Sequence, residues 1–104
     1  MIRLPFPAAL ALAISLVPSA LAQQPDSSLG RNLAAACANC HGTNGVSQAG
    51  MPSLAGRERA ILAQQMQDFR TGKRPATVMH QIARGYTEEQ VEAIAAYLSA
   101  QKTR

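Results

Sequence analysis

The most constraining feature of this 104-residue chain is the segment at residues 37–41, which reads C-x-x-C-H. This spacing is the attachment pattern for a c-type haem, in which two thiols form thioether bonds to the vinyl groups of one porphyrin. If residues 29–41 are helical, Cys37, Cys40 and His41 share one face at positions i, i+3 and i+4. The histidine would then lie under the iron as an axial ligand. The motif predicts a helix face packed against a flat, covalently bound ligand.

A C-x-x-C pair has three other uses, which remain as alternatives. A thiol-redox pair is typical of a βαβ pattern, and the sequence shows none. A zinc site needs four ligands, and here two of them would be consecutive residues. Its ligands would be Cys37, Cys40, His41 and His80. A disulfide between the two cysteines would close a very small loop and constrain the chain little.

Residues 1–22 have the pattern of a secretory signal peptide. Arg3 supplies a short positive region, and residues 8–17 form an apolar stretch. That stretch is shorter than the roughly 20 apolar residues that a membrane span needs. Residues 20–22 read A-x-A, which indicates a cleavage site. We expect cleavage after Ala22, export to the periplasm and no stable membrane insertion afterwards; an uncleaved anchor is the alternative.

The remaining residues, 23–104, are expected to form one small domain with few large side chains for a core. Only Phe69, Tyr86 and Tyr97 are aromatic in this part. A domain of this size is marginally stable unless something braces it. Both cysteines belong to the C-x-x-C-H segment, so there is no disulfide framework. A covalently bound haem would be the largest apolar body in the core, which is a second reason to expect a prosthetic group.

The charge balance is mildly basic, with a formal net charge of +4. Such a surplus suits docking to acidic protein surfaces. No basic run with interleaved aromatic residues occurs, so nucleic-acid binding is not supported. Four cations flank the segment that contains Met79, and as a group they could steer a redox partner towards an exposed haem edge. They are Arg70, Lys73, Arg74 and Arg84.

The sequence predicts an all-α fold, because no stretch shows the period-two alternation of a strand. A first helix is expected from Asp26 or Ser27 to about His41, and Gly42 would end it. Residues 42–56, which are rich in Gly, Asn, Ser and Pro, are expected to form a long loop.

Three further helices are expected after this loop. The second helix covers residues 58–71, and a short helix covers residues 77–84. The apolar face of the second helix is Ile61, Leu62, Met66 and Phe69. Thr87 caps the last helix, and Gln90 completes a capping box. The buried stripe of this helix is Val91, Ile94, Ala95 and Leu98.

A second axial ligand would have to approach the iron from the porphyrin face opposite His41. A thioether sulfur is a suitable soft ligand and raises the reduction potential of the iron. Met79 lies between the second and last helices and has room to reach that face. Met66 is expected in the core, and Met51 lies close to the proximal side. These two residues, His80 or an open sixth position remain as alternatives, although His80 points about 100° away from Met79 on a helix.

The second ring nitrogen of His41 also needs a hydrogen-bond partner, because such contacts fix the ring and tune the metal. A backbone carbonyl in residues 51–53 is a suitable acceptor. Pro52 lacks an amide donor and would stiffen this loop. A plain turn role for Pro52 is the alternative.

Taken together, these features resemble class I c-type cytochromes over residues 28–101. The resemblance rests on C-x-x-C-H, on Met79 and on three other segments in order. These segments are MPSLAG at 51–56, QMQDF at 65–69 and IAAYL at 94–98. The chain looks most like the small haem domains of bacterial dihaem cytochromes and of flavocytochrome c sulfide dehydrogenases. The stretch at residues 77–86 looks closer to the haem subunit of the flavocytochrome.

The resemblance implies a small cytochrome c fold, with about four helices wrapped around one covalently bound haem c. The first and last helices would cross near Gly30, with Tyr97 and Leu98 packing there. The chain contains a single C-x-x-C-H, so we expect one haem and not two.

The resemblance also implies roles for the site residues. Cys37 and Cys40 would attach the haem. His41 and Met79 would be the axial iron ligands, and the carbonyl of Pro52 would accept a hydrogen bond from His41.

The function that follows is periplasmic one-electron transfer without a catalytic site of its own. The resemblance points to the haem subunit that accepts electrons from a sulfide-oxidising flavoprotein, and Met51, Leu54 and Val78 would supply an apolar docking patch. A free diffusible carrier of a respiratory chain is the alternative. An enzyme acting at an open haem and a thiol-redox protein also remain open.

Overall fold

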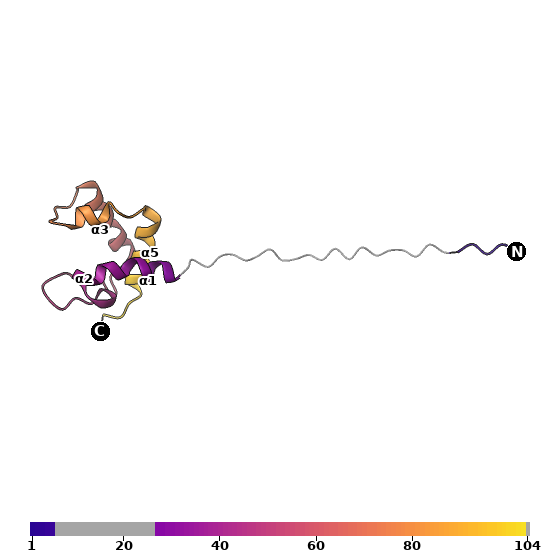
Figure 1. The fold of residues 1–104 in the computed structure, drawn as a ribbon, viewed down its shortest axis with the longest axis horizontal. Coiled ribbons are helices and arrows are strands. Elements are labelled where there is room, and N and C mark those ends of the chain that lie inside the picture. The colour runs from indigo at the N-terminus through magenta and orange to yellow at the C-terminus, as the bar shows by residue number, and fades with distance from the viewer. Residues whose placement is uncertain (6–26, 104) are drawn as a thin grey trace.

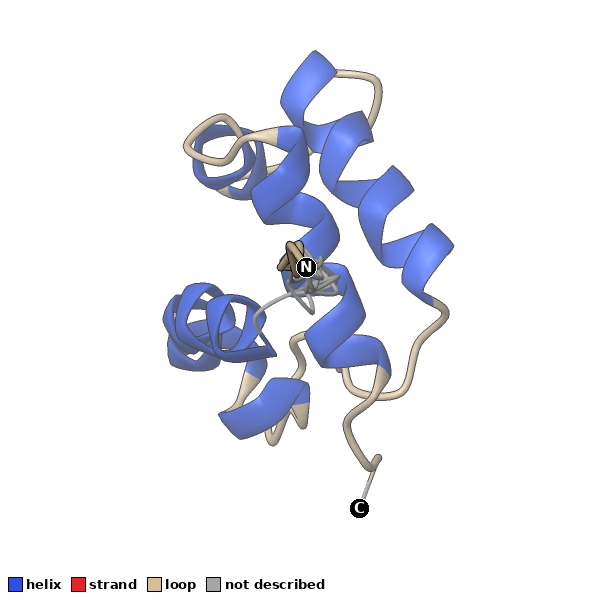
Figure 2. Ribbon diagram, turned by 90° about the vertical axis from the view of Figure 1, so that its right-hand side faces the viewer, coloured by secondary structure: helices blue, strands red, loops and turns tan. Residues whose placement is uncertain are grey.

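The computed structural model describes residues 1–5 and 27–103 of the chain (Figure 1). The described residues form α1 (Ser27–Ala34), η1 (Ala35–Cys37), α2 (Ala38–His41), η2 (Thr43–Gly45), α3 (Arg59–Thr71), α4 (Met79–Ala83) and α5 (Glu88–Ser99), where η denotes a 3₁₀ turn. These ranges contain no strand, so the prediction of an all-α fold is confirmed (Figure 2). Among the same residues, no helix has the length and apolar character to cross a bilayer. The expected cleavage site after Ala22 lies outside the described residues.

The sequence predicted one continuous helix up to about His41. The structure divides this run into α1, η1 and α2. The run tightens into the 3₁₀ turn η1 between α1 and α2, although Ala34, Cys37 and Ala38 keep right-handed helical dihedral angles. Such turns are common near helix ends. The run ends at Gly42, as predicted, where φ is +83° and a Cβ atom would lie 1.9 Å from the carbonyl oxygen of Val46. Only glycine fits this position.

The loop that follows contains one turn of regular structure, η2, that the sequence did not predict. Asn44, inside this turn, has a φ of +53° and lies in the left-handed region that asparagine tolerates. The hydroxyl of Tyr97 donates a 2.6 Å hydrogen bond to the Asn44 side-chain oxygen. This bond connects the turn to α5.

Helix α3 begins one residue later than predicted and ends at Gly72, which has a φ of +79°. Leu62 is buried on this helix, and Met66 and Phe69 are half-buried. Ile61 was predicted on the same face, but its side chain is 46% exposed. The prediction was wrong because Ile61 lies roughly 80° around the helix axis from Phe69, at the edge of the apolar stripe.

Helices α4 and α5 agree closely with the prediction. Helix α4 is shorter than the expected range of 77–84 by two residues at its start and one at its end. Helix α5 has the expected capping box, in which the Thr87 hydroxyl accepts from the Gln90 amide at 3.1 Å and the Gln90 side chain accepts from the Thr87 amide at 2.9 Å. All of its predicted stripe is buried, namely Val91, Ile94, Ala95 and Leu98.

The core is small and rich in alanine. Its main cluster joins α1, α3 and α5 and consists of Ala34, Leu62, Ile94, Ala95 and Leu98. Helix α5 packs against both α1 and α3, while α4 packs against α3. In Figure 1, α1 and α2 lie in the lower half of the domain and α3 lies in the upper half. Helix α5 contacts α1 in the lower half and α3 in the upper half, and so connects the two halves of the domain.

The predicted crossing of the first and last helices lies at Gly30. A Cβ atom at this residue would lie 2.4 Å from the carbonyl oxygen of Ala93 and 3.0 Å from the Cβ of Tyr97. The two backbones can come this close because Gly30 has no side chain. The crossing at Gly30 is confirmed, with Tyr97 packed there and Leu98 in the adjacent core.

Candidate functional site

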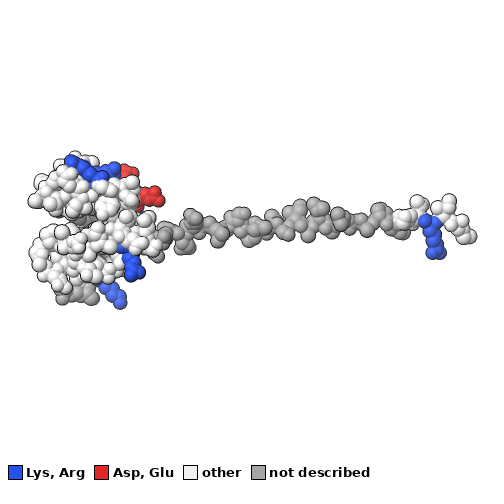
Figure 3. Space-filling model, viewed as in Figure 1, with Lys and Arg blue, Asp and Glu red and all other residues white. Residues whose placement is uncertain are grey.

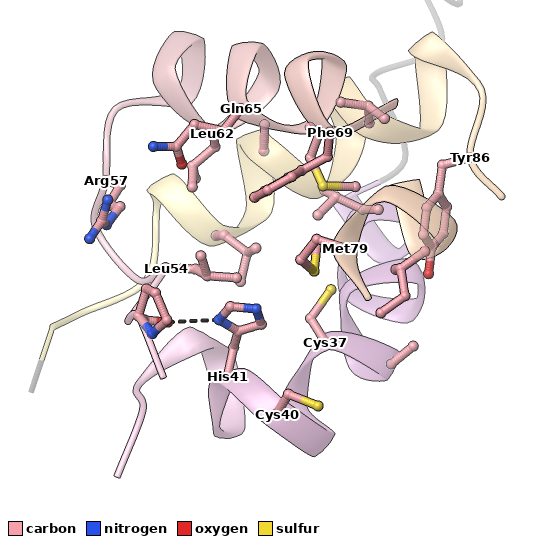
Figure 4. Close-up of a pocket in the computed structure, with 18 of the residues that line it drawn as sticks. Cys37, Cys40, His41, Leu54, Arg57, Leu62, Gln65, Phe69, Met79 and Tyr86 are labelled. Atoms are coloured by element: carbon pink, nitrogen blue, oxygen red, sulfur yellow. Dashed lines mark hydrogen bonds between the residues drawn. The ribbon is translucent and has the colours of Figure 1, made fainter. Parts of the chain in front are cut away.

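A cavity of about 550 Å³ lies between the two halves of the domain (Figure 4). This volume falls in the range of about 300–1,000 Å³ that is typical of ligand and cofactor pockets. Its wall is mostly apolar, and α3 and α5 supply much of the apolar part. Six of these apolar side chains are Leu62, Met66, Phe69, Val91, Ile94 and Leu98. The residues predicted as site residues line the same cavity, so the structure brings them together.

The C-x-x-C-H segment forms one side of the cavity. Cys37 ends η1, while Cys40 and His41 lie in α2, and all three side chains line the cavity. Both thiols are free, with Cys37 half-buried and Cys40 exposed. His41 is buried, with 8% of its surface exposed. The helical run therefore presents two thiols and one imidazole to a single space, as the motif spacing predicted.

The imidazole of His41 is held by the backbone of the loop that faces it. Its Nδ1 atom lies 2.7 Å from the carbonyl oxygen of Pro52. A carbonyl can only accept, so Nδ1 carries the proton and donates, and in the neutral imidazole Nε2 then keeps a free lone pair. This is the tautomer that a metal-binding histidine requires.

The loop that carries the Pro52 carbonyl is itself fixed by backbone contacts. The amides of Leu54 and Ala55 both donate to the carbonyl of Gly45, at 2.8 and 3.1 Å. The Ser53 hydroxyl accepts from the amide of Ser47 at 2.9 Å. The acceptor for His41 is therefore part of a preformed turn.

Three methionines also line the cavity. Met79 is the first residue of α4, Met66 lies on α3, and Met51 lies in the loop before Pro52. Met51 is 42% exposed, whereas the other two are half-buried. In Figure 4, Met79 lies above Cys37, on the side of the cavity towards Phe69. The cavity wall thus offers thioether sulfur from elements other than the one that carries His41.

His80 is half-buried and does not line the cavity. Its Nδ1 atom is buried and has no hydrogen-bond partner among the described residues. The sequence placed His80 about 100° around the helix axis from Met79, and its side chain does not share the cavity with Met79. Its place outside the cavity gives no support to a bis-histidine haem.

The other uses of the cysteine pair fit the site poorly. A redox-active thiol needs a lowered pKa, whereas burial raises the pKa of the Cys37 thiol. A thioredoxin-like βαβ unit would need strands, and the described residues contain none. Among these residues, no three His, Cys, Asp or Glu side chains are grouped as a metal site, so the zinc alternative has no support there.

The residues present fit a covalently bound haem. The cavity supplies two thiols for the vinyl groups, an imidazole in the tautomer that leaves Nε2 free, and an apolar wall for a flat ring. An apolar wall of this kind excludes water and tunes the potential of an iron centre. The donor set is that of a haem protein, because sulfur and imidazole are the axial ligands that haem iron takes in cytochromes.

Three polar residues of the cavity wall were not predicted as part of the haem site, although Arg74 was expected among the cations that steer a partner; they are Arg57, Gln65 and Arg74. Gln65 could have been found, because it lies one turn from both Leu62 and Phe69 on the inward face of α3. No comparable periodicity marks Arg57 or Arg74, because both belong to loops.

An all-helical domain with C-x-x-C-H facing an apolar cavity defines a class I c-type cytochrome. The chain belongs to the family described as "Cytochrome C oxidase, cbb3-type, subunit III", whose sequence profile matches residues 25–98. The chain carries one covalent haem c and works in electron transfer.

Similar proteins include the cytochrome subunit of sulfide dehydrogenase from Chlorobaculum tepidum, which is 41% identical over 67% of this chain and 64% of its own length. Cytochrome c-554(548) from Halomonas halodenitrificans is 33% identical over 74% of this chain and 98% of its own length. The crystal structure of reduced cytochrome c4 from Pseudomonas stutzeri superposes with a TM-score of 0.68, 28% identity, and coverage of 73% of this chain and 48% of that one. The chain therefore spans about half to two thirds of the sulfide dehydrogenase subunit and of cytochrome c4.

Proposed function

We propose that Cys37 and Cys40 attach the haem and that His41 and Met79 are its axial ligands. The observation that carries this proposal is the 2.7 Å hydrogen bond from His41 Nδ1 to the Pro52 carbonyl, because it holds the ring with Nε2 free. Met79 is favoured over Met51 because it is less exposed and because Met51 is adjacent to Pro52, on the side of the cavity that contacts His41. Met66 is the internal control for this choice, since it lines the same cavity from α3.

The haem supplies one-electron exchange when it is bound. The chain contributes three things to that chemistry. His41 and Met79 would occupy both axial positions and so leave neither open to a substrate. The Pro52 carbonyl orients the imidazole. The apolar side chains of α3 and α5 keep water from the ring.

We further propose that the protein is exported to the periplasm and accepts electrons from a sulfide-oxidising flavoprotein. The similarity to the Chlorobaculum tepidum subunit supports this partner. An apolar patch at the mouth of the cavity also supports it. Met51, Val78 and Ile82 line the cavity and are 42%, 50% and 42% exposed. Leu54, which we expected in this patch, is half-buried and packs on the core instead. A stable subunit needs such a patch more than a transient carrier does.

Size-exclusion chromatography of the native protein from its own periplasm, followed at the haem absorption, tests this proposal. Co-elution with a flavin-containing chain and rapid haem reduction on addition of sulfide are the expected results. Elution as a lone small protein, reduced by sulfide no faster than another c-type cytochrome, would contradict the subunit assignment.

A freely diffusing carrier is the second candidate. The specific observation in its favour is that this chain covers 98% of cytochrome c-554(548), a relative of about one domain in length. The chromatography separates the two candidates, because a carrier elutes alone and still accepts electrons from several donors.

Basic side chains around α4 would assist either kind of docking. Lys73, Arg74 and Arg84 are exposed. Figure 3 shows basic side chains along the upper edge of one face, with acidic side chains beside them. Reversing the charge of Lys73 and Arg74 should slow association at low ionic strength and weaken its dependence on salt. The double variant Arg31→Glu with Lys102→Glu, at two exposed sites outside α4 and its flanking loops, is the control, because it changes the net charge by the same amount. Equal changes in the association rate of the two variants would mean that net charge, and not the position of the cations around α4, sets this rate.

A further inference from the structure

Two polar side chains of the cavity wall have no partner within the described protein. Arg57 is exposed and Gln65 is half-buried, and neither side chain makes an ion pair or a hydrogen bond in the part of the chain that the structure describes. Their sequence neighbours differ. Arg59 pairs with Glu92 at 3.3 Å, and the Gln64 amide donates to Asp68 at 2.9 Å. Arg59 and Gln64 do not line the cavity, so of these four side chains the two without a partner are the two that border it.

Arg57 and Gln65 lie at the same end of the cavity. In Figure 4, the guanidinium of Arg57 and the amide end of Gln65 lie to the left of His41, whereas Cys37 and Cys40 lie to its right. The backbone fixes the position of Arg57. Its amide donates to the carbonyl of Leu54 at 3.3 Å, and the amide of the preceding glycine donates to Leu98 at 3.0 Å.

The covalent chemistry of a haem decides what this end of the cavity receives. The two vinyl groups and the two propionate carboxylates lie towards opposite edges of the porphyrin. If Cys37 and Cys40 take the vinyl groups, the carboxylates lie at the end that Arg57 and Gln65 border. We propose that Arg57 and Gln65 bind the haem carboxylates. This inference rests on the proposed attachment through the two cysteines.

The side chains have the chemistry for this task. A guanidinium can give a carboxylate two parallel, charge-assisted hydrogen bonds, and an amide nitrogen can give a neutral one. A carboxylate at the edge of an apolar cavity needs such donors, because burying it without them is costly. Arg57 and Gln65 provide them from the loop before α3 and from α3 itself.

Arg74 also lines the cavity, but its side chain is already engaged. Its guanidinium lies over the ring of Phe69, with 5.4 Å between the guanidinium carbon and the ring centroid. A cation in this position is attracted to the face of the ring. Arg57 has no such contact in the described residues, so it is the freer donor.

The test uses the holoprotein made with a cytochrome maturation system. Covalent haem is first verified by mass in each variant, because absence of the haem would refute the attachment and not the carboxylate site. Resonance Raman spectra then report the propionate bending modes, which respond to hydrogen bonds at the carboxylates. Arg57→Gln and Gln65→Leu should each shift these modes. The matched controls, Arg59→Gln and Gln64→Leu, should leave them unchanged.

The reduction potential gives a second, independent readout. Loss of the Arg57 charge beside the haem should lower the potential, because the ferric state carries one more positive charge than the ferrous state. Arg59→Gln should move it less, since Arg59 is already paired with Glu92. Arg57→Lys should restore the potential but not the vibrational modes, because it keeps the charge and loses the paired donors. Bending modes that respond to Arg74→Gln and not to Arg57→Gln would overturn the assignment.

Discussion

The crossing of α1 with α5 and the cavity between α2 and α3 are built in opposite ways. At the crossing, Gly30 brings two backbones so close that a Cβ atom would lie 2.4 Å from the carbonyl of Ala93. In the cavity, apolar side chains border about 550 Å³ of space. Protein atoms alone fill the space at the crossing, which we call the closed region, whereas the cavity needs a bound group to fill it.

The difference explains how so small a core can work. Alanine supplies half of the buried hydrophobic residues in the described part of the chain, which are Ala34, Ala55, Leu62, Ala83, Val91, Ile94, Ala95 and Leu98. Small residues allow close helix packing but bury little apolar surface. The haem supplies the missing apolar surface, and the crossing sets the spacing of the walls around it.

The largest expected effect follows from removing the covalent attachment. The double variant Cys37→Ala with Cys40→Ala should lose all covalent haem, because no thiol remains to form a thioether bond. With the cavity unsupported, its cooperative thermal unfolding transition should broaden or disappear. Mass spectrometry of protein from a maturation-competent host measures the attachment, and circular dichroism measures the unfolding. A double variant that keeps the mass of haem would contradict the assignment of the thiols.

The next effect separates two residues of the same cavity wall. Met79→Ala should open the sixth coordination position, lower the reduction potential and allow carbon monoxide to bind the reduced iron. Met66→Ala should leave the ligation intact and destabilise the fold by about 2–5 kcal/mol as a truncation of a packed side chain. Absorption spectra with carbon monoxide and denaturant titrations measure the two outcomes. Carbon monoxide binding by the Met66 variant alone would reverse the two roles.

Adding one methyl group at Gly30 tests how tightly α1 and α5 pack at their crossing. Gly30→Ala should destabilise the protein by about 1–3 kcal/mol, because α1 and α5 must move apart. This outcome opposes helix propensity, which favours alanine over glycine by about 1 kcal/mol. Gly85→Ala is the matched control, since its Cβ would meet the nearest atom, the carbonyl oxygen of Ile82, at 3.3 Å. Equal denaturation midpoints for the two variants would show that the crossing is looser than described.

The smallest expected effect lies outside both regions, at the start of α5. Thr87→Ala removes the hydroxyl that accepts from the Gln90 amide. The cost should be about 1 kcal/mol, as for other N-cap threonines. Thr77→Ala, at an exposed threonine without a hydrogen bond in the described structure, should change the free energy of unfolding by less than about 0.5 kcal/mol. A larger loss in the Thr77 variant would mean that the capping box is not what stabilises this helix start.

Local signals allowed most of the helices and their ends to be predicted from the sequence. The capping box and stripe of α5 follow from residue spacing, and both are present. The ends at Gly42 and Gly72 follow from the conformational freedom of glycine. The 3₁₀ turn at η1 was missed because it depends on packing at the end of a helix and not on the local pattern. The exposure of Ile61 was missed because this residue lies at the edge of the apolar stripe of α3.

The cavity was harder to predict than the helices around it. The motif identified Cys37, Cys40 and His41, and all three line the cavity. The contribution of Arg57 was not visible, because a single arginine in a loop carries no periodic signal. Its place at the cavity depends on the turn from Leu54 and on the contact between the preceding glycine and Leu98, which are distant in sequence.

The central prediction for this protein is a covalent haem whose iron is ligated by protein side chains on both faces. The most direct test is the absorption spectrum of the reduced wild-type holoprotein before and after addition of carbon monoxide. We predict the sharp bands of a six-coordinate c-type haem and no change with carbon monoxide, because the proposed ligands His41 and Met79 would fill both axial positions. A spectrum without haem bands, or a rapid shift on addition of carbon monoxide, would contradict the account.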